Sequence, residues 1–167
     1  MSAAALYTPE VLAEAVSLAG FPLDNALPLH GEARSRACGS NLALRLRTDA
    51  QGRIVAAGCS AKACAIGQAA AALFLRSAAG RDRAAIAEAR GELAQWLASD
   101  CALTDCPLPD WPGIALLQPA RRHPGRHAAI LLAWDAALAA LGGEPMVAGL
   151  PTAGSATYGT RSEARAR

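Results

Sequence analysis

Cysteine is the residue type in this sequence best suited to chemistry, and two of the five cysteines stand in contexts that favour reactivity. Cys38 precedes Gly39, which lets the backbone turn closely around whatever the thiol binds. Cys64 stands just before an alanine-rich segment expected to be helical, and the free N–H groups of a helix start stabilise a thiolate, as does nearby Lys62. A thiolate is what metal ions and sulfur acceptors require. The sequence therefore predicts a metal or sulfur site, although either cysteine alone could be a small buried apolar residue.

The surroundings expected for these thiols follow from composition. The N-terminal residues lack the basic start and apolar core of a secretory signal, so we expect a cytoplasmic protein in which cysteines are reactive groups, ligands or core residues rather than disulfides. The most apolar stretch, residues 63–75, is short for a membrane span and contains Gln68. With 16 basic against 14 acidic residues, no strong positive field would attract nucleic acid. We expect neither a membrane nor a nucleic-acid partner.

A small sheet is expected to position Cys38. Strict alternation over residues 42–47 places Leu42, Leu44 and Leu46 on one face, which is typical of a half-buried strand. A polar turn over 48–52 leads into a returning strand at 53–57, and a third strand is expected between residues 30 and 37.

Helices should make up most of the remaining chain, because alanine contributes much of the 53% hydrophobic content. The expected helices begin at Pro9, after Cys64, at Asp82 and at Ala128; the last ends at Leu141. Residues 101–124 are rich in proline and are expected to form an ordered loop that could hold a short strand at 114–117. The predicted fold is α+β, a three-stranded antiparallel sheet with helices packed on one face. We expect one domain over 1–143 and a disordered tail over 144–167.

The order and spacing of these features resemble those of a known family. Cys38-Gly39, a hairpin with Gly52-Arg53-Ile54 at its second strand, and the run from Ala63 to Ala71 opening a helix resemble the iron–sulfur cluster assembly scaffolds, the NifU N-terminal domain and IscU-like proteins. The resemblance covers residues 36–79 well and the final helix loosely. It implies an IscU/SufE-like fold.

The resemblance also implies a function. In that family three cysteines and an aspartate bind zinc or assemble a transient [2Fe–2S] cluster, with sulfur from a cysteine desulfurase and apo proteins as acceptors. Cys38 and Cys64 match the first two cysteines. The aspartate's position holds Ser40, a much weaker metal ligand, and an alanine stands where the third cysteine is expected. His127 could supply an imidazole nitrogen beside Cys38 and Cys64, or could simply flank the last helix.

Several alternatives stay open. The chain could be a scaffold without enzymatic turnover, a degenerate zinc-binding or metal-free sulfur acceptor of a cysteine desulfurase, or an interaction protein with structural cysteines. Two cysteine pairs, each five residues apart, could also clamp a structural zinc, although we expect Cys101 and Cys106 to be loop thiols and Cys59 to end a strand. His123 is a weaker ligand candidate and His30 is expected at the surface. No phosphate-binding glycine loop, Gly-x-Ser-x-Gly elbow or His-Glu-x-x-His pair is present.

Overall fold

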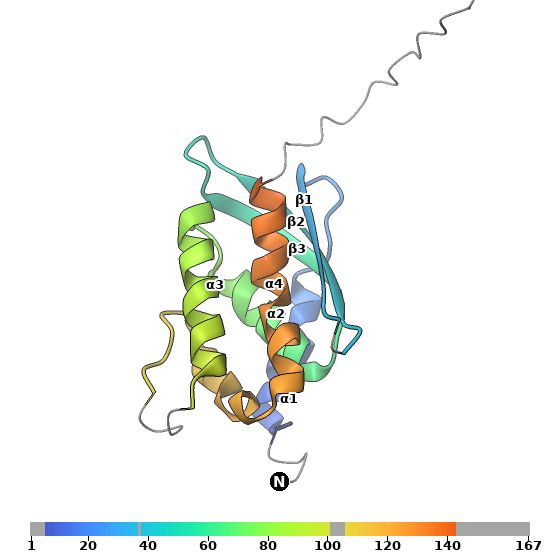
Figure 1. The fold of residues 1–167 in the computed structure, drawn as a ribbon. Helices are drawn as coiled ribbons and strands as arrows, with labels where there is room; N and C mark the ends of the chain where they lie inside the picture. Colours follow the sequence, from blue (N-terminus) through green and yellow to red (C-terminus); the bar gives the residue numbers. More distant parts are fainter. Residues whose placement is uncertain (1–5, 37, 101–105, 143–167) are drawn as a thin grey trace, which may run out of the picture.

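The computed structural model describes residues 6–36, 38–100 and 106–142. Within these ranges the chain forms helices and three strands in this order: α1 (Pro9–Ser17), η2 (Leu18–Gly20), β1 (Leu29–Arg34), β2 (Asn41–Thr48), β3 (Ile54–Lys62), α2 (Ala65–Ser77), α3 (Arg83–Ala98), η3 (Ile114–Arg122) and α4 (Pro124–Gly142). The strands pair antiparallel in the order β1-β2-β3. The α-helices pack over one face of this sheet (Figure 1), which confirms the predicted α+β fold.

The inner face of the sheet is apolar, as the alternation predicts. Leu42, Leu44 and Leu46 are all buried beneath the helices. On β1 the inner face carries Gly31, and a Cβ there would lie only 2.0 Å from the carbonyl oxygen of Ala136 in α4. The backbones of β1 and α4 are therefore in direct contact, and glycine is what allows it.

Three aromatic rings fill the core between α2, α4 and the segment before η3. Phe74 and Trp111 stack with centroids 5.5 Å apart, and Trp134 meets both rings edge-on at 5.2 and 5.0 Å. The Trp111 Nε1 donates a hydrogen bond to the Leu73 carbonyl at 3.1 Å. Such rings contribute large buried apolar area with a preferred geometry, so Trp111 anchors the loop that carries it.

The connection from η2 to β1 crosses the outer face of the sheet. The Phe21 carbonyl accepts a hydrogen bond from Cys59 N, and a Cβ at Gly58 would meet the Pro22 carbonyl oxygen at 2.1 Å. Further along, Arg45 donates to the Leu27 carbonyl at 3.1 Å. This segment covers the middle of the outer face.

Three elements differ from the sequence predictions. β3 runs to Lys62 rather than ending near 57, because it pairs with β2 over its whole length. The segment at 114–117 is not a strand but part of the 3-10 helix η3. α4 begins at Pro124, four residues earlier than predicted, because proline suits the first position of a helix. The predicted tail, residues 144–167, lies outside the described residues.

Candidate functional site

The two candidate cysteines lie at the same end of the sheet. Arg34 at the end of β1 pairs with Asn41 at the start of β2, and Asn41 pairs with Lys62 at the end of β3. Cys38 lies in the loop between β1 and β2, and Cys64 lies two residues beyond β3. Figure 1 shows this loop, the start of α2 and the start of α4 at one end of the molecule, on the lower right. We call this region the cysteine end.

The start of α4 is held at the cysteine end by close helix packing. A Cβ at Gly67 in α2 would lie 3.3 Å from the Cβ of Ala129 in α4. The positive charge of Arg126, in the first turn of α4, also contributes to the lowered pKa of Cys38. Because α4 begins at Pro124, His127 lies within its first turn rather than before the helix.

Two buried serines surround the thiol of Cys38. Its Sγ lies 3.1 Å from Ser35 Oγ and 3.0 Å from Ser40 Oγ. Ser35 and Ser40 are 3% and 5% exposed, and their backbones are joined by a 2.8 Å hydrogen bond from Ser35 N to Ser40 O. A thiol has one proton to donate, so at least one hydroxyl donates to the sulfur, and both can donate to a thiolate.

The electrostatic consequence is a stabilised thiolate. Hydrogen bonds from Ser35 and then Ser40 lower the pKa of Cys38 from its ordinary value, burial opposes them, and the charge of Arg126 adds a smaller lowering effect. Since the thiolate is the nucleophile and the metal ligand, this environment favours both roles.

Cys64 occupies the N-cap position of α2, as the sequence predicts. Its backbone is extended (φ −65°, ψ 166°), and its side chain makes no capping hydrogen bond. The thiol is free and partly buried. The side chain of Gln68, one turn along, donates to the Ala63 carbonyl at 2.9 Å. Cys64 is thus placed at a helix start with its sulfur not committed to the backbone.

His127 faces η3 with one ring nitrogen. Its Nε2 lies 2.9 Å from the carbonyl oxygen of Arg121. A carbonyl can only accept a hydrogen bond, so the proton of a neutral ring is on Nε2 and Nδ1 carries the lone pair. Metal-binding histidines commonly make this kind of second hydrogen bond to a backbone carbonyl.

The donors at the cysteine end do not form a complete metal centre by themselves. Within the three described ranges, no three side chains of His, Cys, Asp or Glu lie close enough together to hold a metal ion. Of the ligands that the family resemblance implies, the described residues supply two thiols, Cys38 and Cys64. Ser40 stands where the resemblance implies a carboxylate, and its hydroxyl lies 3.0 Å from Cys38 Sγ.

The other cysteines do not support a second zinc site. Cys59 is 6% exposed in β3, and burial raises the pKa of its thiol to about 11, which disfavours the thiolate that zinc requires. Cys106 is disulfide-bonded, so the prediction of a free loop thiol there is wrong. That prediction rested on the expected compartment, which carries no geometric information. Cys101 lies outside the described residues.

Sequence reasoning missed Ser35 and Arg126, which both lower the pKa of Cys38, Ser35 with the largest effect and Arg126 with the smallest. Ser35 precedes the cysteine by three residues, and only the loop geometry brings its hydroxyl to the sulfur. Arg126 lies 88 positions further along, and no local pattern links it to the cysteine. The spacing Ser-x-x-Cys-x-Ser is a weak signal that could have indicated a hydrogen-bonded thiol.

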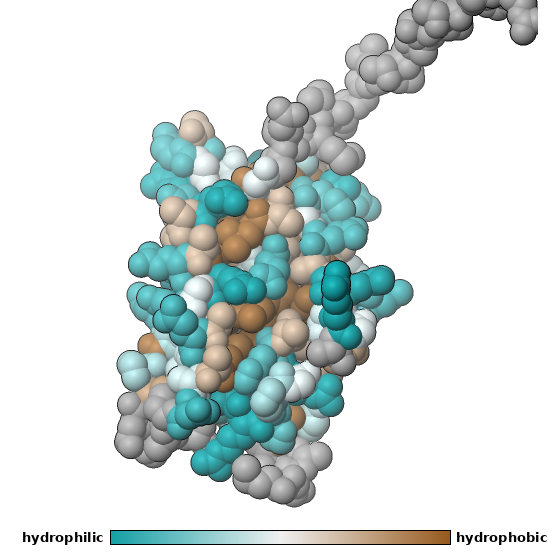
Figure 2. Space-filling view, in the orientation of Figure 1, coloured by the Kyte–Doolittle hydropathy of each residue, from teal (hydrophilic) through white to brown (hydrophobic). Residues whose placement is uncertain are grey.

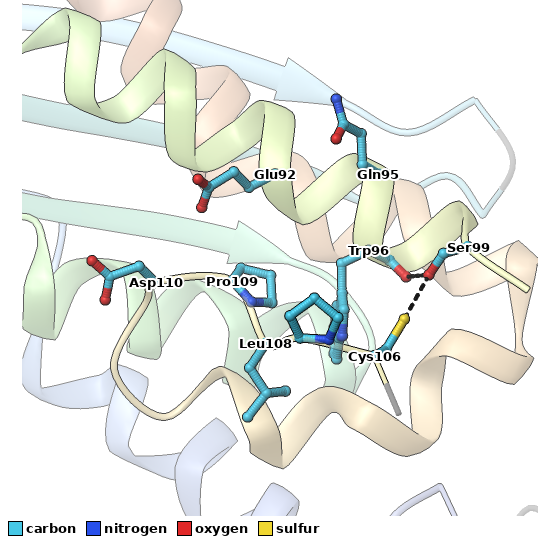
Figure 3. Close-up of a pocket in the computed structure, with 9 residues that line it drawn as sticks. Glu92, Gln95, Trp96, Ser99, Cys106, Leu108, Pro109 and Asp110 are labelled. Atoms are coloured by element: carbon cyan, nitrogen blue, oxygen red, sulfur yellow. Dashed lines mark hydrogen bonds between the residues drawn. The ribbon is translucent and has the colours of Figure 1, made fainter. Parts of the chain in front are cut away.

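A separate hollow of about 520 Å³ lies between α3 and the segment 106–110 (Figure 3). Trp96 forms part of its wall, and the Ser99 hydroxyl at its edge lies 3.2 Å from Cys106 Sγ. Buried Arg121 donates to the Trp96 carbonyl at 3.0 Å and to the Ser99 carbonyl at 2.9 Å, and so caps the C-terminal end of α3. None of the predicted site residues lines this hollow.

No protein-family profile and no curated relative matches the chain. Solved structures do, and they define the class: this is an α+β protein of the IscU/NifU-like fold, as the sequence resemblance predicts.

Three of these solved structures resemble the chain over most of its length. The N-terminal part of a nitrogen-fixing NifU-like protein from Brucella abortus has a TM-score of 0.71 at 22% identity, covering 83% of this chain and 93% of its own. An iron–sulfur cluster assembly scaffold protein for the SUF system, described as putative, from Fervidobacterium islandicum AW-1 has a TM-score of 0.69 at 17% identity, with coverages of 84% and 99%. A hypothetical protein has a TM-score of 0.58 at 15% identity, with coverages of 80% and 97%. In the part of the chain that was described, no helix is long and apolar enough to cross a membrane.

Proposed function

We propose that this protein is a scaffold-like component of iron–sulfur cluster assembly, which holds iron and sulfide, or zinc, through Cys38 and Cys64. The observation that carries the proposal is the placement of two free thiols at one end of an IscU/NifU-like fold, one of them surrounded by buried hydroxyls. Its role is to bind and hand on cargo, so no catalytic turnover of its own is required.

The residues divide this work by their chemistry. Cys38, with its lowered pKa, supplies a thiolate from the loop side, and Cys64 supplies a sulfur from the start of α2. We propose His127 as the third donor, through Nδ1. Because no three such side chains lie together among the described residues, its ring must move towards the two thiols when cargo binds. Sulfur comes from a cysteine desulfurase, and apo acceptor proteins receive the product.

The test is anaerobic reconstitution of the whole protein with iron and sulfide, followed by assays of iron, acid-labile sulfide and zinc. We expect bound iron and sulfide in the wild type, at least a tenfold loss in Cys38→Ser and Cys64→Ser, and a smaller loss in His127→Ala. Cys59→Ala is the matched control, because that thiol is buried, and it should retain the wild-type content. Equal loss in all four variants, or no bound iron in the wild type, would contradict cluster scaffolding.

A second candidate function is favoured by the geometry of Cys38 alone, since a hydroxyl-stabilised thiolate is also a good sulfur acceptor. In this reaction the Cys38 thiolate attacks the terminal sulfur of a donor persulfide. A new S–S bond forms at Cys38, the donor's S–S bond breaks, and the donor cysteine leaves as a thiolate, so no external oxidant is needed.

The two functions separate experimentally. With a cysteine desulfurase and free cysteine, an acceptor gains one sulfur atom at Cys38 in the absence of iron, which mass spectrometry detects on the Cys38 peptide. The Cys64→Ser variant should still accept sulfur at Cys38 if acceptance is the function, and should lose cluster loading if scaffolding is. Absence of the added sulfur from the wild type would remove this second candidate.

A further inference from the structure

Cations gather around the cysteine end. Arg34, Asn41 and Lys62 form one row across β1, β2 and β3 on the outer face of the sheet, as the strand register places them. Neighbouring strands lie about 4.8 Å apart, so the Cα atoms of Arg34 and Lys62 are about 10 Å apart, with a neutral amide between them. Both charged side chains are exposed.

Two more cations belong to the cysteine end, and one of them, Arg126, acts on the Cys38 thiol. Arg36 is exposed in the β1–β2 loop, and Arg126 is partly exposed in the first turn of α4. We call Arg34, Arg36, Lys62 and Arg126 the cationic rim. Figure 2 shows the most hydrophilic colour gathered over the lower end of β1, on the right of the view, next to the more apolar surface over α4.

The rim residues have no ionic partner in the described part of the chain, as is also true of Arg47 and Arg83, whereas several other cations are paired. Elsewhere, Arg53 pairs with Asp49, Arg76 with Glu14, and Arg90 with Asp135. Among the described residues, no ion pair involves a rim residue.

One carboxylate, Glu32, lies on the same sheet face and beside the same hollow as Arg34 and Asn41, but no ion pair joins it to Arg34 in the described residues. Glu32 lies two residues before Arg34, and its Oε1 is 3.3 Å from His30 Nε2. Four cations that make no ion pair within the described residues therefore lie at the proposed working end, although the net charge of the whole chain is only +2. A concentrated field of this kind favours an anionic partner and speeds its encounter.

We propose that the cationic rim is a docking surface for an acidic polypeptide segment of the protein that delivers sulfur to Cys38. This inference rests on the proposed function for the identity of the partner. An extended chain carries its alternate side chains on one side, about 7 Å apart, so two alternate carboxylates can reach Arg34 and Lys62 together. The Asn41 amide between them can donate to the carboxylates or to the segment's backbone.

The test uses a fluorescein-labelled decaglutamate peptide as the probe, with anisotropy recorded at low and at physiological salt. The Arg34→Glu/Lys62→Glu double variant should bind the peptide at least tenfold more weakly than the wild type. The matched control is Arg47→Glu/Arg83→Glu, which reverses two exposed cations at the opposite end of the sheet and should change affinity less than threefold. Bound peptide should also slow alkylation of Cys38.

Other outcomes would overturn the docking surface. Equal weakening in the two double variants would show attraction to net charge alone. Displacement of the peptide by millimolar thiosulfate at constant ionic strength would assign the rim to a small anion instead. The assay needs neither iron nor sulfide, so its result is independent of whether the reconstituted protein holds a cluster.

Discussion

Removing the two hydroxyl groups around Cys38 should make this cysteine a slower nucleophile. The changes are Ser35→Ala, Ser40→Ala and the double variant. Each deletes one hydroxyl about 3 Å from the sulfur and leaves the backbone hydrogen bond between the two serines in place. Ser60→Ala, an exposed position on β3, is the matched control.

The magnitude follows from the strength of the lost contacts. A hydrogen bond to a charged group is worth about 1.5–3 kcal/mol when buried, and the partial exposure of Cys38 reduces this to about 1 kcal/mol for each hydroxyl. That is about a fivefold loss of thiolate below neutral pH. A more basic thiolate is intrinsically more nucleophilic, which restores about half of the logarithmic loss. We expect about twofold slower reaction in each single variant and about fivefold in the double variant.

The assay is alkylation of the native protein by iodoacetamide, with the Cys38 peptide quantified by mass spectrometry over a range of pH. The hydroxyl groups lower the pKa of Cys38, so the rate profile of the double variant should move to higher pH, while Ser60→Ala follows the wild type. Equal rates in the wild type and the double variant, with both proteins folded by circular dichroism, would refute the assigned role of the serines.

Two further predictions concern the fold around the site. Burial raises the pKa of the Cys59 thiol from 9.0 to about 11, so its contribution to stability is complete below pH 9 and is lost as the pH rises through about 11. The free energy of unfolding, measured in urea, should fall at alkaline pH by about 2 kcal/mol less in Cys59→Ala than in the wild type. Identical dependence on pH in the two proteins would contradict this. Gly31→Ala should lower the free energy of unfolding by about 3 kcal/mol, because its Cβ would collide with the backbone of α4, whereas Gly91→Ala, in open space on α3, should raise it by about 0.5–1 kcal/mol. A Gly31→Ala protein as stable as the wild type would show that β1 and α4 are not in direct contact.

Local patterns in the sequence predicted the elements that have strong periodicity or capping residues. The alternation of Leu42, Leu44 and Leu46 is preserved because one face of β2 is buried and the other is not. The helix after Cys64 was predictable because an alanine-rich run, favourable for a helix, is closed by Gly80. These two elements, with their connecting hairpin, are enough to place both cysteines at one end.

Features that depend on tertiary contacts were not predictable from the sequence. η3 contains Pro119, and proline favoured a loop in the sequence analysis. In the structure, the burial of Ile114 and Leu117 holds the segment in a 3-10 helix. The start of α4 was placed too late because Pro124 follows a proline-rich stretch. The serine contacts of Cys38 require the loop to close through the hydrogen bond from Ser35 N to Ser40 O, and no periodicity encodes that closure.

Cys38 and Cys64 are proposed to form one site. Phenylarsine oxide tests this directly, because its arsenic binds two nearby thiols and releases water, independently of iron, sulfide or zinc. We predict one arsenic atom per native protein, linking the Cys38 and Cys64 peptides in the mass spectrum and absent from Cys38→Ser and Cys64→Ser. A protein that forms no such link while both thiols are reduced, or that links either thiol to Cys59 instead, would contradict the account.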